Sequence, residues 1–223
     1  MRLSGPLRAL TTLAVVVLAA GCAREALSST PISPPSASTT TPIGTSRANP
    51  GGSSASTTTE PAPVPGKVFM VGDSVMESTD AKHTNAAEEV IGAAGWDITM
   101  DALKNRKTSE GRAIVKANLK KLPDTVVIML GHNDDQAKFA DEVNAMLGLL
   151  TGVDRVYWVT MVEPRFAKAN ATLRAVQPYY PNLHLIDWAS QVKKEWMVTD
   201  GLHLREIGSE NLAKVILAGL SGN

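Results

Sequence analysis

The chain contains 223 residues, with 22 basic and 22 acidic side chains, so its formal net charge is zero. With balanced charges and no block of basic residues, the chain lacks the positive surface that nucleic-acid-binding proteins need. We therefore expect no nucleic-acid partner. Cys22 is the only cysteine, which excludes an intramolecular disulfide.

The first 21 residues have the order of an export signal. Arg2 and Arg8 precede an uncharged run at 10–20, which ends in small residues and is too short to span a bilayer. The run leads to Cys22 and resembles the signal of a bacterial lipoprotein, in which the cysteine is acylated and becomes the mature N-terminus. An ordinary signal peptide with a free thiol is the alternative. The resemblance implies that acyl chains on Cys22 anchor the protein to the outer face of the cytoplasmic membrane.

Residues 22–66 have the composition of a tether. Of the 38 residues at 28–65, 25 are Ser, Thr or Pro, and only Arg47 and Glu60 are charged. Such a segment can bury little apolar surface, so we expect it to be disordered and extended. Residues 67–223 are long enough for one domain with its own core.

Apolar runs alternate with amphipathic patterns along this domain. Short apolar runs predict strands at 68–71, 96–100, 125–130, 155–160 and 183–187. Helical patterns follow each of them, at 86–94, 109–122, 135–150, 165–177, 188–195 and 207–220. The alternation implies right-handed crossovers between parallel strands. We therefore predict a three-layer α/β/α domain with a five-stranded parallel sheet in the flavodoxin-like order 2-1-3-4-5.

Polar residues follow the ends of these predicted strands. The four segments are Asp73-Ser74, the loop at 101–107, Gly131-His132-Asn133-Asp134 and Asp200-Gly201-Leu202-His203. Because the C-terminal ends of parallel strands meet at one edge of the sheet, where α/β proteins bind ligands, we expect these segments to gather there.

Together the segments can supply nucleophilic catalysis. The hydroxyl of Ser74 becomes a useful nucleophile if His203 takes its proton, and Asp200 can orient the imidazole. An oxyanion could be stabilised by the backbone N–H of Ser74, the side-chain amide of Asn133 and a backbone N–H from the loop at 101–107. Gly-Asp-Ser alone could also be an ordinary helix cap.

Gly72-Asp73-Ser74, Gly131-x-Asn133-Asp134 and Asp200-x-x-His203 resemble the motif blocks of the SGNH/GDSL hydrolase family. They occur in the family's order and extend over the whole domain. The resemblance implies the SGNH hydrolase fold. It also implies Ser74 as nucleophile, His203 as general base and acid, Asp200 as its partner and Asn133 as an oxyanion donor.

The loop at 101–107 departs from the family pattern, because it lacks the glycine whose N–H enters the oxyanion hole. Its Asp-Ala…Arg-polar sequence is similar to the extracytoplasmic SGNH domains of bacterial peptidoglycan O-acetyltransferases, as are Asp187-Trp188 and the segment from Trp196 to Gly208. This similarity puts Asn105 in the glycine's place. Asparagine adopts a left-handed backbone more readily than most residues.

Three further side chains are candidates for binding substrate. His132 could line the pocket beside Asn133, Arg106 could hold an anionic group, and Trp188 could stack on a sugar. The alternatives are a surface histidine, a solvated loop and a core aromatic residue. Asp-x-x-His could hold a metal, but no other cluster has ligand spacing, so we expect neither a metal nor another cofactor.

These patterns predict a serine esterase outside the cytoplasmic membrane, acting through an acyl-enzyme on O-acylated glycans or lipids of the cell envelope. Transfer of the acyl group to an envelope sugar is an alternative. This chain contains no fused membrane acyltransferase domain to supply acyl groups, which favours hydrolysis. A non-catalytic envelope-binding lipoprotein on the same fold is a further alternative. We expect a monomer.

Overall fold

The computed structural model describes residues 64–222. The predicted signal sequence, Cys22 and nearly all of the predicted tether lie outside these residues. Within the described part of the chain, no helix is both long enough and apolar enough to cross a membrane.

Five parallel strands form the sheet, in the order β2-β1-β3-β4-β5. This order and the three-layer α/β architecture confirm the predicted fold class. The strand bounds differ from the predicted ones by at most two residues, and the starts of β3, β4 and β5 are as predicted: β1 (Lys67–Gly72), β2 (Asp97–Ala102), β3 (Thr125–Met129), β4 (Arg155–Val159) and β5 (Leu183–Ile186).

The helical segments follow the predicted pattern, most of them with shorter bounds, although α6 begins one residue earlier than predicted and α1 was given no predicted bounds. They are α1 (Ser74–Glu77), η1 (Glu88–Gly92), α2 (Thr108–Asn118), η2 (Leu119–Lys121), α3 (Phe139–Leu149), α4 (Ala167–Val176), η3 (Gln177–Tyr179), α5 (Trp188–Gln191), η4 (Lys194–Trp196) and α6 (Glu206–Leu220). The helix predicted at 86–94 is a short π-helix, η1, and that at 188–195 divides into α5 and η4. Helix α3 starts four residues late because the Asp135 carboxylate accepts the N–H of Ala137 and holds a turn there.

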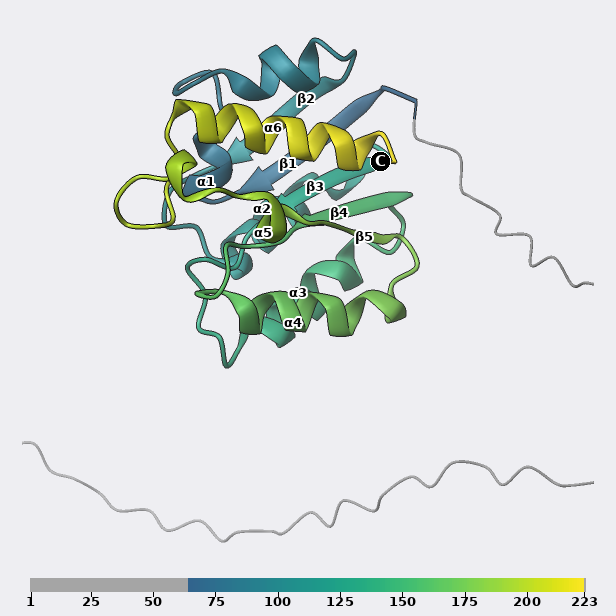
Figure 1. The fold of residues 1–223 in the computed structure, drawn as a ribbon. Helices are drawn as coiled ribbons and strands as arrows, with labels where there is room; N and C mark the ends of the chain where they lie inside the picture. The colour runs from purple at the N-terminus through teal and green to yellow at the C-terminus, as the bar shows by residue number, and fades with distance from the viewer. Residues whose placement is uncertain (1–63, 223) are drawn as a thin grey trace, which may run out of the picture. The chain divides into compact units, whose positions relative to one another are not determined.

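Side chains alternate between two hydrophobic layers, one on each face of the sheet. In β1, Phe69 and Val71 pack with residues of α2, α3 and α4, whereas Val68 and Met70 pack with residues of α6 and η1. Figure 1 shows α6 and η1 on one side of the sheet and α3 and α4 on the other. All five residues of β3 are buried, as expected for a central parallel strand.

The strand order determines where loops can meet. β1 pairs with β2 on one side and with β3 on the other, so the chain changes direction across the sheet at β1. Such a switch point opens a crevice at the C-terminal ends of the strands. The segments after β1, β2 and β3 border this crevice.

Candidate active site

Ser74 is the first residue of α1, directly after β1. A Cβ on Gly72 would lie only 2.4 Å from that of Met76, so the tight strand-to-helix turn requires glycine. The helix is capped by Asp73, whose Oδ1 accepts the N–H of Val75 at 3.0 Å. Because Asp73 supplies the cap, the hydroxyl of Ser74 is left for another partner.

That partner comes from the loop between η4 and α6. An isolated antiparallel bridge joins Met197 to Leu204, and the N–H of Val198 donates to the carbonyl of His203 at 2.8 Å. Gly201 has a φ of 67° in this loop, in the left-handed region that favours glycine. Figure 1 shows the loop beside α1.

Ser74, His203 and Asp200 form a continuous chain of hydrogen bonds. The distance between Ser74 Oγ and His203 Nε2 is 3.0 Å, and that between His203 Nδ1 and Asp200 Oδ2 is 2.6 Å. The other carboxylate oxygen of Asp200 accepts the backbone N–H groups of Leu202 and His203, at 2.9 and 3.0 Å. The structure thus brings together the three residues that the sequence motifs predicted as a triad.

The hydrogen bond from the His203 side chain, with those from the two backbone N–H groups, lowers the pKa of Asp200 from 3.8 to about 2. Asp200 is therefore a carboxylate at neutral pH. A carboxylate next to Nδ1 keeps the proton on that nitrogen, which leaves Nε2 as the acceptor for the Ser74 hydroxyl.

This chain of hydrogen bonds is open to solvent. The side chains of His203 and Asp200 are 48% and 45% exposed. Water can therefore reach both side chains.

Asn105 and Asn133 occupy neighbouring loops at the same edge. Asn105 has a φ of 62°, the left-handed backbone expected for a residue in a glycine's place. The side-chain amide of Asn133 donates to the carbonyl of Arg106 at 3.1 Å, which fixes its orientation and leaves its second N–H for another acceptor. Their roles as oxyanion donors remain predictions.

Arg106 does not have the free position expected of a substrate-binding residue. Its side chain is only 7% exposed, and it donates to the carbonyl of Gly72 at 3.2 Å, to the carbonyl of Asp101 and to the carboxylate of Asp101 at 2.6 Å. Its fork thus fastens the loop after β2 to the ends of β1 and β2. With its donors directed inward, Arg106 is unsuited to hold an anionic substrate.

His132 is neither a surface residue nor an exposed part of the pocket wall. Its side chain is 2% exposed, and its Nδ1 lies 2.7 Å from Oδ2 of Asp73, which is fully buried. The ring of His132 meets that of Phe166 edge-on, with centroids 4.9 Å apart. Direct contact with substrate would require both rings to move.

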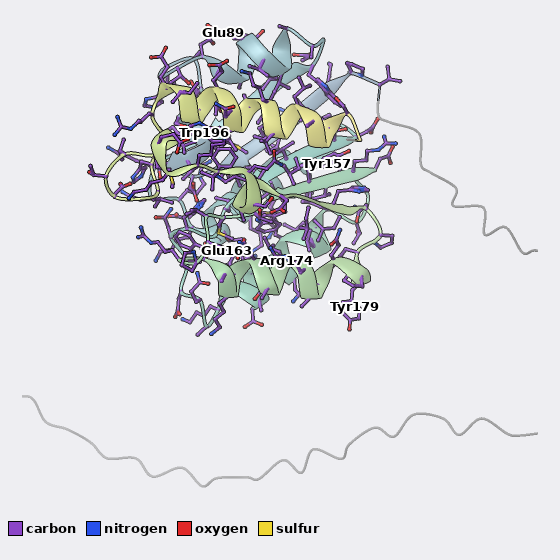
Figure 2. The ribbon with its side chains drawn as sticks, viewed as in Figure 1. Glu89, Tyr157, Glu163, Arg174, Tyr179 and Trp196 are labelled. Carbon is purple, nitrogen blue, oxygen red and sulfur yellow. The ribbon has the colours of Figure 1, made fainter. Side chains whose placement is uncertain are left out.

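Trp188 belongs to the core. It is 1% exposed and stacks on Trp196 with ring centroids 5.9 Å apart. Trp196, labelled in Figure 2, is the last residue of η4, just before the loop that carries His203. Stacking on a sugar would require this face to be free, so the burial of Trp188 favours the core alternative.

Two connections support the site but were not predicted. The Asp134 carboxylate accepts the backbone N–H and the hydroxyl of Thr108, at 3.0 and 2.9 Å, and so joins the loop after β3 to the start of α2. Burial raises the pKa of Asp134, although these hydrogen bonds oppose the shift. Behind the triad, the hydroxyl of Ser209 in α6 donates to that of Ser78, which follows α1, at 2.8 Å. Motif spacing gives no signal for such long-range contacts.

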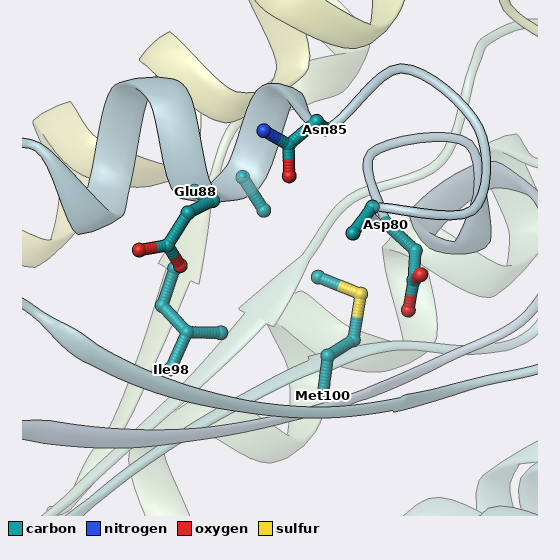
Figure 3. Close-up of a pocket in the computed structure, with 7 residues that line it drawn as sticks. Asp80, Asn85, Glu88, Ile98 and Met100 are labelled. Carbon is teal, nitrogen blue, oxygen red and sulfur yellow. The ribbon is translucent and has the colours of Figure 1, made fainter.

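A separate pocket of about 210 Å³ lies where the segment at 80–88 faces β2 (Figure 3). It has two acidic side chains near an apolar floor formed by β2, and it contains none of the predicted site residues. Its lining is Asp80, Ala81, Asn85, Ala87, Glu88, Ile98 and Met100. Within residues 64–222, no group of three His, Cys, Asp or Glu side chains is arranged to hold a metal ion.

No protein-family model matches this sequence, and no curated protein does. Solved structures do match. The C-terminal catalytic domain of peptidoglycan O-acetyltransferase A from Streptococcus pneumoniae has a TM-score of 0.57 and 21% identity, over 71% of this chain and 94% of that domain.

Two further solved structures give similar matches. The esterase EstA from Pseudoalteromonas sp. has a TM-score of 0.54 and 15% identity, over 67% of this chain and 93% of its own. A member of the lipolytic G-D-S-L family from Veillonella parvula has a TM-score of 0.55 and 14% identity, over 68% and 96%. Residues 64–222 therefore have the α/β fold of the SGNH/GDSL hydrolases.

Proposed function

We propose that this protein is a serine esterase that cleaves acyl esters through an acyl-enzyme. The observation that carries the proposal is the unbroken path from the Ser74 hydroxyl through His203 to the Asp200 carboxylate, with distances of 3.0 and 2.6 Å. The alternative role of Ser74 as a helix cap does not explain this path, because Asp73 already caps α1.

In the first half-reaction, Oγ of Ser74 attacks the ester carbonyl carbon while Nε2 of His203 takes the hydroxyl proton. Asp200 stabilises the imidazolium that forms. The backbone N–H of Ser74, which lies in the first turn of α1 and outside the helical ladder, can donate to the oxyanion. The backbone N–H of Asn105 and the free amide N–H of Asn133 are the other donors. His203 then returns the proton to the leaving alkoxide.

In the second half-reaction, water attacks the acyl group on Ser74 while His203 acts again as the base. The carboxylic acid leaves and the hydroxyl of Ser74 is restored. The exposure of the His203 and Asp200 side chains supports hydrolysis over transfer, because water can reach the base.

The same exposure favours substrates that approach from a surface, such as an O-acylated glycan or lipid of the cell envelope. The fold shared with a peptidoglycan O-acetyltransferase domain is compatible with a glycan ester. The export signal and the lipid anchor at Cys22, predicted from the sequence, would hold the enzyme on the outer face of the cytoplasmic membrane.

Turnover of p-nitrophenyl acetate by the purified full chain tests the proposal. We expect Ser74→Ala and His203→Ala to lose the activity, whereas His83→Ala should keep it because His83 is a half-exposed histidine whose ion-pair partner is Glu77 and not a residue of the triad. A parent chain no faster than Ser74→Ala would refute the esterase proposal.

Transfer to a sugar is tested in the same reaction with a chitooligosaccharide added. Mass spectrometry should detect acetate and no chitooligosaccharide that carries an additional, O-linked acetyl group. If the acetylated sugar is the main product, the protein is a transferase.

A further inference from the structure

A buried acid–base pair lies directly behind the proposed nucleophile. Asp73 is fully buried, and the side chain of His132 is 2% exposed. Oδ2 of Asp73 lies 2.7 Å from Nδ1 of His132. They come from different loops, 59 positions apart in the chain. Each immediately precedes a residue of the proposed site, Ser74 in one case and Asn133 in the other.

Every polar group of Asp73 holds the nucleophile segment in place. Its backbone N–H donates to the carbonyl of Met129 at the end of β3, at 3.1 Å, and its Oδ1 caps α1 through the N–H of Val75. Only Oδ2 reaches across to the loop after β3, through His132. The pair is thus the side-chain connection between the turn that aims Ser74 and the loop that carries Asn133.

The backbone of the second loop is shaped to send His132 inward. Gly131 has a φ of 129°, and a Cβ there would lie within 3 Å of both Met161 and Phe139. The chain therefore turns at Gly131, where only glycine fits. The ring of Phe166 then seats the imidazole edge-on at 4.9 Å, which restricts its orientation.

The burial of His132 shows whether its side chain can contact substrate or can only position other residues. A buried carboxylate needs a hydrogen-bonded partner, and His132 supplies it. Because Asp73 is fully buried and the side chain of His132 is only 2% exposed, a substrate at Ser74 would have little of either side chain to contact. We propose that His132 is a positioning residue, which fixes the separation between the Ser74 nucleophile and the Asn133 oxyanion donor through its hydrogen bond to Asp73. The inference rests on the proposed esterase function.

The kinetic test compares His132→Ala, His132→Asn and His83→Ala in the full chain with p-nitrophenyl acetate. The amide of asparagine can place an N–H close to where Nδ1 lies, so His132→Asn should restore most of the kcat that His132→Ala loses. A displacement of the reacting groups by about 1 Å can cost on the order of 10²-fold, and we expect a loss of that size in kcat for His132→Ala with KM unchanged. His83→Ala should match the parent.

Three kinetic results would overturn the proposal. An unchanged kcat in His132→Ala would mean that the pair does not position the site. A loss confined to KM would mean that His132 contacts substrate. A His132→Asn variant as slow as His132→Ala would mean that the hydrogen bond is not what matters.

Amide hydrogen exchange makes the test independent of catalysis. If the pair joins the two loops, His132→Ala should speed exchange at both 73–78 and 131–134, and His132→Asn should restore protection. Unchanged exchange in His132→Ala refutes the coupling even if the parent chain is an esterase. Conversely, a parent chain without esterase activity but with coupled exchange refutes only the proposed function.

Discussion

Replacing Arg106 by methionine should destabilise the fold, although Arg106 lies in a polar loop. Methionine keeps much of the length and volume of the side chain and removes the guanidinium. The change deletes the hydrogen bonds to the carbonyls of Gly72 and Asp101 and the ion pair with the Asp101 carboxylate.

The three lost interactions differ in weight. The carbonyl of Gly72 keeps the N–H of Leu103 at 3.2 Å, so its loss is small. The carboxylate of Asp101 is 39% exposed and can be solvated, so its pairing contributes about 0–1 kcal/mol. The charged hydrogen bond to the Asp101 carbonyl contributes about 1.5–3 kcal/mol. We expect Arg106→Met to lower the free energy of unfolding by about 2–4 kcal/mol.

Urea unfolding of the full chain measures this loss, with Arg112→Met as the matched control. Arg112 also pairs with a carboxylate, Glu142 at 3.1 Å, but its side chain is 35% exposed. Its removal should cost about 0–1 kcal/mol. Arg106→Lys should recover only part of the loss, because an ammonium group cannot reproduce the guanidinium fork. Equal unfolding free energies for Arg106→Met and Arg112→Met would refute the reasoning.

The other predictions concern the proposed site. Asn133→Ala should lower kcat by about 10²–10³-fold, and an unchanged kcat would exclude its oxyanion role. Asn105→Gly should leave the urea midpoint close to that of the parent, because glycine adopts the left-handed backbone of this position. Asn105→Ala should lower the free energy of unfolding by about 1 kcal/mol, because alanine is strained in that conformation. Equal urea midpoints for the two variants would contradict this. Because the folded-state pKa of Asp200 lies below 3.8, its hydrogen bonds to the His203 side chain and to the two backbone N–H groups stabilise the fold above about pH 4, and this contribution is lost as the pH falls through about 2. The difference in urea midpoint between the parent and Asp200→Asn should therefore shrink from pH 6 to pH 2, and a constant difference would contradict it.

The central strands could be predicted because burial on both faces leaves a plain apolar signal, and the alternation of strands with helices indicated their order. β3 is buried along its whole length and its predicted start was correct. Parallel pairing then brings the loops after the strands to one edge, which is why the meeting of Ser74 with His203 could be expected. Helix bounds were less accurate, since local hydrogen bonds such as that of Asp135 change where a helix begins.

The three candidate substrate-binding residues show what motif spacing could not predict. Arg106, His132 and Trp188 are polar or aromatic residues near the motifs, and such residues suit a binding pocket. The structure instead gives each of them a partner within the fold: the ends of β1 and β2, Asp73 and Trp196. Such partners depend on the folded arrangement, and residue type alone does not reveal them.

The hydrogen bond between Ser78 and Ser209 has a consequence for the cost of binding. Ser78 follows the helix that carries Ser74, and Ser209 lies in α6, which follows the loop of His203. Ser78 also donates to the carbonyl of Val75 at 2.7 Å, so the contact extends into α1. The nucleophile and its base are thus tied together behind the reacting atoms before any ligand arrives. The entropy of bringing them together is lost during folding, and a substrate need not spend its own binding energy to assemble them.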